Sequence, residues 1–243
     1  MGGGAGRAQG NGRAGPTGSG AREGGSLAEQ AYLAVRDRLL TLQIPPGAPV
    51  HEERLCAELG LGRTPVREAV KRLEAERLVV IYPRRGTFAS DINITDHALI
   101  ADVRRQLEGH AAGRAAERAN GRDRKALADL LARTEVAGSW ADTGSLMALD
   151  AEIHGSIYRC THNPYLEATL GQYYNLALRI WYTFIERLED VGDHVAGHGP
   201  LIESILEGRA GVARDLALAH VEGFEQAVLT TELKALGHLG PRS

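Results

Sequence analysis

The sequence contains few cysteines and no long hydrophobic run. Its two cysteines, Cys56 and Cys160, lie far apart and form no CxxC pair, which argues against a disulfide framework or a thiolate zinc site. The longest apolar run, Leu78 to Tyr82, is far shorter than the roughly 20 residues that cross a bilayer. The first residues also lack the hydrophobic segment of a signal peptide. We therefore expect a cytoplasmic protein that has no membrane partner.

The sequence also has no strong excess of either positive or negative charge. The formal net charge is −3 and the pI is near 6.3. Residues 26–95 carry ten Lys or Arg against nine acidic residues, whereas residues 96–243 carry fifteen against twenty-one. Because a nucleic-acid-binding domain is usually clearly basic, the net charge alone does not predict such a partner. With 43% hydrophobic residues the chain should form globular domains, whose function must be inferred from the positions of individual residues.

The first part of the chain is predicted to contain a tail and then a series of helices. Residues 1–25 include eleven glycines and are predicted to be disordered. The Ser-Leu-Ala-Glu sequence at 26–29 is a capping box that starts a first helix, which ends before Pro45. The apolar stripe of this helix is Leu27, Ala31, Val35, Leu39 and Leu42. A second helix is predicted from Glu52 to Leu59, with Gly60 as its stop.

A third helix and a hairpin are predicted next. Thr64 suits the N-cap of this helix and Pro65 its first position, where the missing N–H costs nothing. The helix is expected to run to about Arg77. The hairpin is predicted from a β-branched strand at 78–82, a Pro-Arg-Arg-Gly turn at 83–86 and a return strand at 87–89.

The third helix is predicted to have one apolar face and one cationic face. Its packing sector contains Val66, Ala69, Val70 and Leu73. Arg67 and Lys71 fall in another sector, with Arg63 just ahead on the same side. An arginine fork matches O6 and N7 of guanine, so this face predicts binding in the major groove of DNA. Arg84 and Arg85 would then meet the adjacent backbone or the minor groove. The alternative is a solvated face whose cations pair with neighbouring glutamates.

These residues resemble a known family. The stretch from Arg63 to Val70 and the hairpin after it are similar to the winged helix-turn-helix of GntR-type bacterial transcription regulators. The resemblance implies that the partner is double-stranded operator DNA, which is read by Arg63 and Arg67 with help from Thr64 and the wing glycine Gly86. Relatives commonly have serine where this chain has Gly62, which leaves the operator sequence open.

The acidic second part contains a candidate metal site. Asp150 and His154 are four residues apart, so both project from one helix face and can hold one metal ion. His198 and His220, each within a predicted helix, would complete the site. Three imidazoles and a carboxylate suit zinc, nickel or manganese. Taken singly, each histidine is more often a surface or core residue, and the spacing alone does not decide.

A second resemblance favours the metal. The Asp150-to-His154 motif, Asn163-Pro164 and the segments around His198 and His220 are similar to FCD, the helical effector-binding domain of the FadR subfamily. The resemblance implies that the family's metal ligands fall on Asp150, His154, His198 and His220. His194 lies one turn before His198 and would replace it in a shifted register.

The same resemblance implies a small organic acid as effector, bound near the metal. Arg104 matches the family's arginine, and Arg179 is a second candidate. A guanidinium fork holds a carboxylate with two hydrogen bonds, which suits this role. Arg179 has the alternative of pairing with an acid across the bundle.

We therefore expect a mostly α protein, with an N-terminal winged helix-turn-helix of three helices and a β-hairpin, followed by an all-α bundle. The expected parts are a tail at 1–25, the DNA-binding domain at 26–91, a linker at 92–95, the effector-binding and dimerisation domain at 96–236 and a tail at 237–243. The expected function is that of a repressor that binds an inverted repeat as a homodimer and responds to a small carboxylate.

Two other interpretations remain. The first is a helical metalloenzyme that uses the Asp and His residues for hydrolysis, although Glu152, the nearest general base in sequence, points to a different helix face. The second is a purely structural metal in a dimerisation module that binds no ligand.

Overall fold

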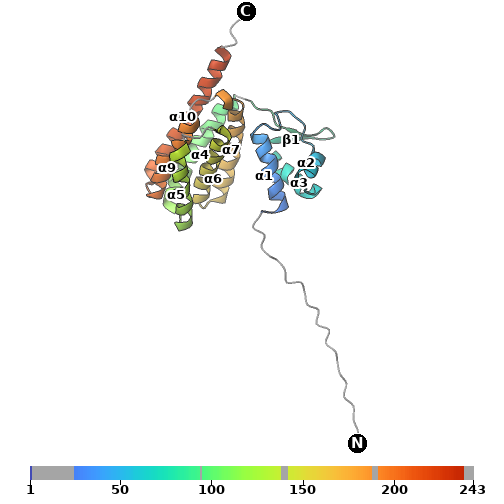
Figure 1. Cartoon of the computed structure of the whole chain (residues 1–243), viewed down its shortest axis with the longest axis horizontal. Coiled ribbons are helices and arrows are strands. Elements are labelled where there is room, and N and C mark those ends of the chain that lie inside the picture. Colours follow the sequence, from blue (N-terminus) through green and yellow to red (C-terminus); the bar gives the residue numbers. More distant parts are fainter. Residues whose placement is uncertain (2–24, 94, 138–141, 188–190, 238–243) are drawn as a thin grey trace, which may run out of the picture.

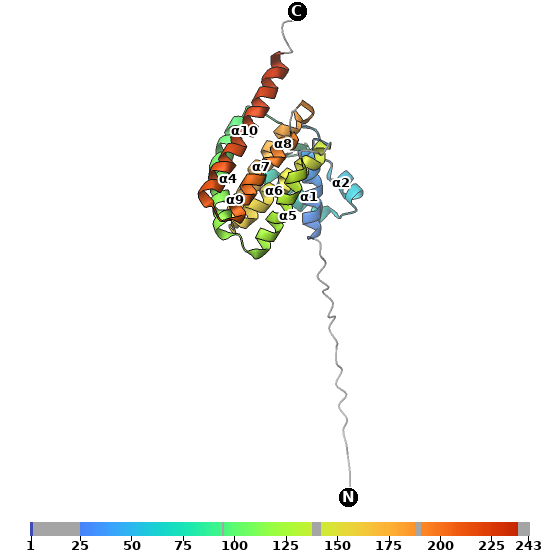
Figure 2. The same ribbon diagram turned by 60° about the vertical axis from the view of Figure 1, so that its left-hand side comes forward.

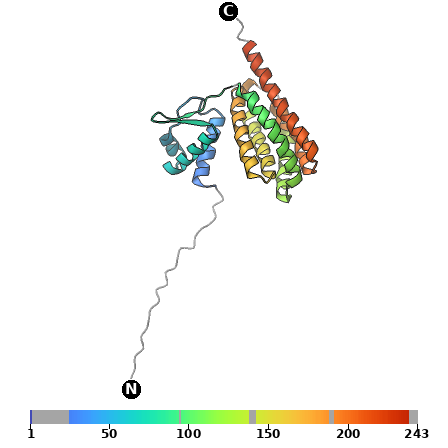
Figure 3. The same ribbon diagram turned by 180° about the vertical axis from the view of Figure 1, so that it is seen from behind.

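The computed structural model shows two bodies side by side, joined by the segment between β2 and α4 (Figures 1 and 3). It describes Met1 and residues 25–93, 95–137, 142–187 and 191–237, with side chains as far as residue 231. Nearly all of the predicted tail at 1–25, part of the linker at 92–95 and residues 238–243 therefore lie outside the described residues. The predicted fold class, a winged helix-turn-helix followed by an all-α bundle, is confirmed.

The first body consists of three helices and a hairpin. Its elements are α1 (Leu27–Leu40), α2 (Glu52–Leu59), α3 (Arg63–Ala75), β1 (Val79–Tyr82) and β2 (Gly86–Ala89). The start of α1 agrees with the capping box, because the Ser26 side chain accepts a hydrogen bond from the Glu29 N–H. The predicted stripe is wrong at its ends. Leu27 in the first turn is 55% exposed, and Leu42 lies beyond the helix in a left-handed conformation (φ 57°).

The prediction for the start of α3 is also wrong. The N-cap is Gly62 rather than Thr64, so α3 begins at Arg63 and Pro65 occupies its third position. Proline is tolerated there because the first N–H groups of a helix have no partner within the helix. At the other end Ala75 is the last helical residue, two residues before the predicted end, and Arg77 turns the chain with φ 63°.

The hairpin contains a short antiparallel pair of strands. Val79 pairs with Ala89, and Tyr82 pairs with Gly86 across the turn. Gly86 has φ 101°, a conformation that favours glycine. The segment at 47–50 lies along the other edge of β2, where its backbone exchanges hydrogen bonds with residues 87 and 89. Sequence patterns did not predict that this segment pairs with β2, because the segment is rich in proline and glycine.

The second body is a helical bundle, and its described residues include no strand. Its elements are α4 (Asp96–Arg118), α5 (Gly121–Ala137), α6 (Thr143–Cys160), α7 (Pro164–Tyr182), the 3-10 turn η1 (Ile185–Arg187), α8 (Val191–Ala196), α9 (Gly199–Leu206) and α10 (Ala210–Gly237). Asp142 caps α6 and Asn163 caps α7, each through its side-chain oxygen. None of the helices in the described ranges has the length and apolarity needed to cross a membrane.

Helix α4 is the central element of the bundle. It packs against α6, α7 and α9, and α10 lies along much of its length (Figure 2). The close approach to α10 depends on small residues, since a Cβ on Gly109 would meet Leu218 Cγ at 3.1 Å. Its buried face brings Arg104 and Glu108 into the interior beside α6 and α7. The fold thus places polar groups from α4 next to the predicted metal ligands on α6.

Candidate functional site

The exposed face of α3 carries the predicted DNA-reading residues. Its opposite face is buried through Val66, Ala69, Val70 and Leu73, each at most 1% exposed. Arg63 and Arg67 keep 73% and 67% of their side chains exposed. Thr64 and Lys71 are exposed as well. A rigidly packed helix therefore presents two guanidinium groups from its first two turns.

The exposed arginines of α3 are held by glutamates of α2. Arg63 Nη2 lies 2.9 Å from Glu53 Oε1, and Arg67 Nε lies 3.1 Å from Glu52 Oε2. Exposed pairs of this kind are weak because water screens them. Arg72 faces inward to α1 instead, where its guanidinium lies 3.5 Å from the centre of the Tyr32 ring. Arg63 and Arg67 can therefore exchange their glutamate partners for another anion at little cost in free energy.

The predicted wing residues lie at the tip of the hairpin. Arg84 and Arg85 are exposed within the turn, and Gly86 begins β2. Arg84 has φ 63°, which is costly for a residue with a side chain. The turn is closed by a hydrogen bond of 3.1 Å from the Arg85 N–H to the Tyr82 carbonyl. The tip therefore presents two cations on a short, hydrogen-bonded loop.

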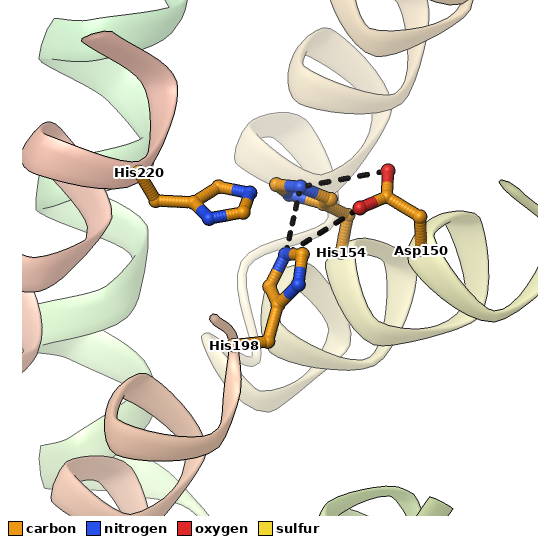
Figure 4. Close-up of side chains that lie close together, drawn as sticks. All are labelled: Asp150, His154, His198 and His220. Atoms are coloured by element: carbon orange, nitrogen blue, oxygen red, sulfur yellow. Dashed lines mark hydrogen bonds and ion pairs between the residues drawn. The ribbon is translucent and has the colours of Figure 1, made fainter. Parts of the chain in front are cut away.

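The four predicted metal ligands lie together inside the bundle. One ligand atom from each of Asp150, His154, His198 and His220 falls within 4.8 Å of the others (Figure 4). Asp150 and His154 come from α6 and His220 from α10. His198 differs from the prediction, because it is the N-cap of α9 rather than a residue within a helix. The cluster is therefore built from three segments that are far apart in the sequence.

Several polar atoms of this cluster lack the hydrogen-bond partners that buried groups normally have, and a metal ion would supply a partner for them. Asp150 Oδ1 and His220 Nε2 are buried and have no hydrogen-bond partner. Nε2 of His198 and Nε2 of His154 lie 3.3 Å apart, and each is within 3.9 Å of the Asp150 carboxylate. Burying unpaired polar atoms is costly, and a shared cation would satisfy all of them. The donor set fits a transition-metal ion.

The protonation states agree with metal binding. Burial lowers the pKa of His198 to about 3, and burial together with neighbouring histidines holds the pKa of His220 well below its usual range. Burial opposes ionisation of Asp150, but His154 and His194 hold its pKa below the usual value. At neutral pH His198 and His220 are therefore neutral imidazoles and Asp150 is a carboxylate, the forms that bind metals.

Partners outside the cluster orient two of the imidazoles. His198 Nδ1 lies 3.1 Å from the Val195 carbonyl, which can only accept, so Nδ1 carries the proton and Nε2 faces the cluster. His154 Nδ1 lies 2.9 Å from Glu108 Oε2, so its Nε2 is also directed inward. Tyr174 donates a hydrogen bond of 2.7 Å to Asp150 Oδ2. Such partners fix the tautomer and orientation of metal ligands.

Glu108 also binds the predicted effector residue Arg104. Arg104 Nε donates to Glu108 Oε1 at 2.7 Å, and both side chains are 4% exposed. The guanidinium lies over the rings of Tyr174 and Trp181. Burial alone would raise the pKa of Glu108, but Arg104 and His154 lower it to about 2. Arg104, Glu108 and His154 are thus linked in a chain of polar contacts that leads to the cluster.

This chain makes a testable prediction for Glu108→Gln. The glutamine keeps the shape of the side chain but loses the negative charge that orients His154. We expect the affinity for zinc to fall about 10- to 100-fold, as for other partners of metal-bound histidines. Competition with a chromogenic chelator measures the affinity. Glu117→Gln, which changes an exposed glutamate paired with Arg114, is the matched control. Equal zinc affinities in the two variants would refute the role of Glu108.

Other residues considered in the sequence lie elsewhere. Arg179 does not point into the metal cluster, because its guanidinium binds Ser90 at the junction of the two bodies. His194 lies beside the cluster, with Nε2 3.4 Å from Asp150 Oδ1, but does not belong to the set of four. Glu152 forms an ion pair with Arg133 on the outside of the bundle. Glu152, the candidate general base of the metalloenzyme interpretation, therefore does not face the cluster.

Sequence reasoning missed two polar residues that support the cluster. Glu108 is four residues after Arg104 in a stretch rich in alanine, a spacing that favours an ion pair on one helix face. Tyr174 gave no such signal, because its contact with Asp150 depends on how α6 and α7 pack.

Two protein families match the chain. Residues 27–89 match the family described as bacterial regulatory proteins, gntR family, and residues 99–223 match the FCD domain. An "Uncharacterized HTH-type transcriptional regulator in unstable DNA locus" of Streptomyces ambofaciens is 43% identical over 72 residues, which are 30% of this chain and 29% of that protein. The "Probable D-xylose utilization operon transcriptional repressor" of Paenarthrobacter nicotinovorans is 27% identical over 184 residues, 75% of this chain and 80% of that protein.

A solved structure has the same fold. Escherichia coli McbR/YncC superposes with a TM-score of 0.74 at 20% identity, over 85% of this chain and 99% of that chain. At this identity the likeness establishes the fold alone. The chain spans between 29% and 59% of the length of three curated relatives that it matches, less than two thirds in each case.

Proposed function

This chain belongs to the gntR family of bacterial regulatory proteins and carries an FCD domain, and from that premise we propose that it is a metabolite-responsive repressor. It is a DNA-binding transcriptional regulator rather than an enzyme, since the gntR family that it matches is described as bacterial regulatory proteins. The proposal adds that two copies bind an inverted-repeat operator. A small carboxylate in the helical domain then releases or re-orients the DNA-binding bodies. The relative from P. nicotinovorans is named as a repressor, which supports the sign of regulation.

The single observation that carries the DNA-binding part is the geometry of α3. Arg63 and Arg67 project from the first two turns of a helix whose other face is fully buried. The fixed helix gives these arginines a defined position, which base recognition requires. Lys71, Arg84 and Arg85 are proposed to contact the backbone. A homodimer would place two such helices on two half-sites related by a two-fold axis.

The proposed ligand of the helical domain is a transition-metal ion held by Asp150, His154, His198 and His220. The donor set suits zinc, nickel or manganese. When bound, the ion would supply a positive centre that attracts a carboxylate. Arg104 is proposed to help, although two of its donors are already held by Glu108. The effector must bind more tightly to the DNA-free arrangement, since equal affinity would shift nothing.

A mobility-shift titration tests the proposed function. The probe is the DNA upstream of the protein's own gene, and the competitors are a panel of small carboxylates. We expect a discrete protein–DNA complex that one of the acids dissociates. The Arg104→Lys variant should need at least about tenfold more of that acid, because the lysine lacks the guanidinium fork that holds a carboxylate with two hydrogen bonds. Lysine is preferred to alanine, because alanine would leave the Glu108 carboxylate buried without its cation. A complex that no acid in the panel affects would contradict the effector proposal.

A further inference from the structure

A cavity lies at the junction of the two bodies, away from the metal cluster. Its volume is about 450 Å³. Residues 90–93, which follow β2, line one side together with Arg77, and α4 and α7 line the others. The apolar part of the wall is formed by Ile92, Leu99, Ile100, Val103, Leu176 and Ile180. Leu99 is 69% exposed, so this apolar wall is open to solvent.

One buried cation, Arg179, lies in the wall of this cavity. Its side chain is 2% exposed. Nη1 donates to Ser90 Oγ at 2.6 Å and Nη2 to the Ser90 carbonyl at 2.9 Å, but Nε is buried and has no hydrogen-bond partner. Burial lowers the pKa of Arg179 to about 10, against the influence of Asp91, so the side chain stays protonated at neutral pH.

Arg179 lacks the partner that a buried arginine normally has. In the described part of the chain, no carboxylate forms an ion pair with it. Asp91 acts on this guanidinium without forming an ion pair, so the buried charge is only partly compensated, and the unpartnered Nε can donate to an oxygen of a carboxylate. Arg104 offers the contrast, because Glu108 neutralises that equally buried guanidinium. The junction cavity therefore has the features of an anion site with an apolar wall.

We propose that this cavity binds a monocarboxylate with an apolar body, as a second ligand site separate from the metal cluster. The carboxylate accepts a hydrogen bond from Arg179 Nε, and the apolar body lies against the α4 and α7 walls. A second negative charge on the ligand gains no net attraction, because Asp91 and Asp96 also line the cavity and, among the described residues, outnumber the one other cation of its wall, Arg77. The same guanidinium holds Ser90, so occupancy is linked to the segment that joins the DNA-binding body to the bundle.

Isothermal titration of the full chain with octanoate tests this proposal. Octan-1-ol serves as the uncharged probe and octanedioate as the doubly charged one. We expect octanoate to bind at least about tenfold more tightly than either, since a charge-assisted hydrogen bond is lost with the alcohol. Arg179→Gln should weaken octanoate binding about 10- to 100-fold, and Arg179→Lys should weaken it less.

A second pair of variants guards against misfolding of the Arg179 variants. Leu99 is exposed, so Leu99→Asp can be made without disturbing the core, and it should weaken octanoate binding because it adds a negative charge to the cavity wall. Val212→Asp, at an exposed residue of α10, should leave it unchanged.

The variant His154→Ala/His220→Ala separates this site from the metal site, and it should bind octanoate as the natural chain does. Three results would overturn the junction site. The first is that octanoate does not bind the natural chain. The second is that Arg179→Gln and Leu99→Asp both bind octanoate as tightly as the natural chain does. The third is that the His154→Ala/His220→Ala variant does not bind octanoate. The last result would place the acid at the metal cluster instead.

Discussion

Arg67→Ala is expected to abolish sequence-specific operator binding and leave the protein folded. The side chain projects into solvent from the first two turns of α3, and among the residues that the structure describes it pairs only with Glu52, in an exposed ion pair. Removing it therefore costs the fold little. A specific arginine–guanine contact contributes about 1–3 kcal/mol, and a homodimer loses two of them. The operator dissociation constant should rise at least about thirtyfold.

The measurement is fluorescence anisotropy with labelled operator DNA at fixed salt. Arg114→Ala is the matched control, because Arg114 is a surface arginine of the bundle that is likewise paired with one glutamate. Both variants lose one positive charge, so a general electrostatic effect would appear in both. An operator affinity for Arg67→Ala within a few fold of the control would remove Arg67 from the recognition surface.

His154→Ala/His220→Ala is expected to abolish metal binding. The natural chain should carry about one transition-metal ion per chain, and the variant should carry essentially none, because two of four proposed ligands are gone. His220→Ala alone is the milder test, since its Nε2 has no hydrogen-bond partner to lose. Inductively coupled plasma mass spectrometry of dialysed protein gives the metal content directly.

The control for this experiment is His162→Ala. His162 is an exposed histidine that pairs with Asp123, outside the cluster, so its loss should not change the metal content. Zinc should also raise the melting temperature of the natural chain and not that of the double variant, because a ligand stabilises the state that binds it. Unchanged metal content in His154→Ala/His220→Ala would show that the ion, if any, is held elsewhere.

The agreement between sequence and structure is best where local chemistry decides. Ser26 capped α1 as expected, and Gly60 ended α2, in a left-handed conformation. The prediction for the start of α3 was wrong because Thr64 and Gly62 are both acceptable before a helix, so local chemistry does not decide between them. Local sequence patterns thus predict the presence of a helix more reliably than the residues at which it begins and ends.

The metal cluster could be predicted in part because its first two residues share a helix face. Asp150 and His154 follow from their spacing, whereas the contributions of His198 and His220 required a family resemblance. The contacts of Glu108 and Tyr174 depend on interhelical packing, which no local pattern encodes. Arg179 shows the same limit. Its sequence position suggested an effector residue, but the direction of α7 turns it toward Ser90.

The central claim is that α3 reads DNA under the control of an acid bound near the metal cluster. Its most direct test is an operator titration of the natural chain and of His154→Ala/His220→Ala, with and without the acid that releases the natural chain. We predict that both proteins bind the operator equally without the acid and that only the natural chain is released by it. Equal release of both proteins would contradict the account, since the acid would then act without the metal cluster.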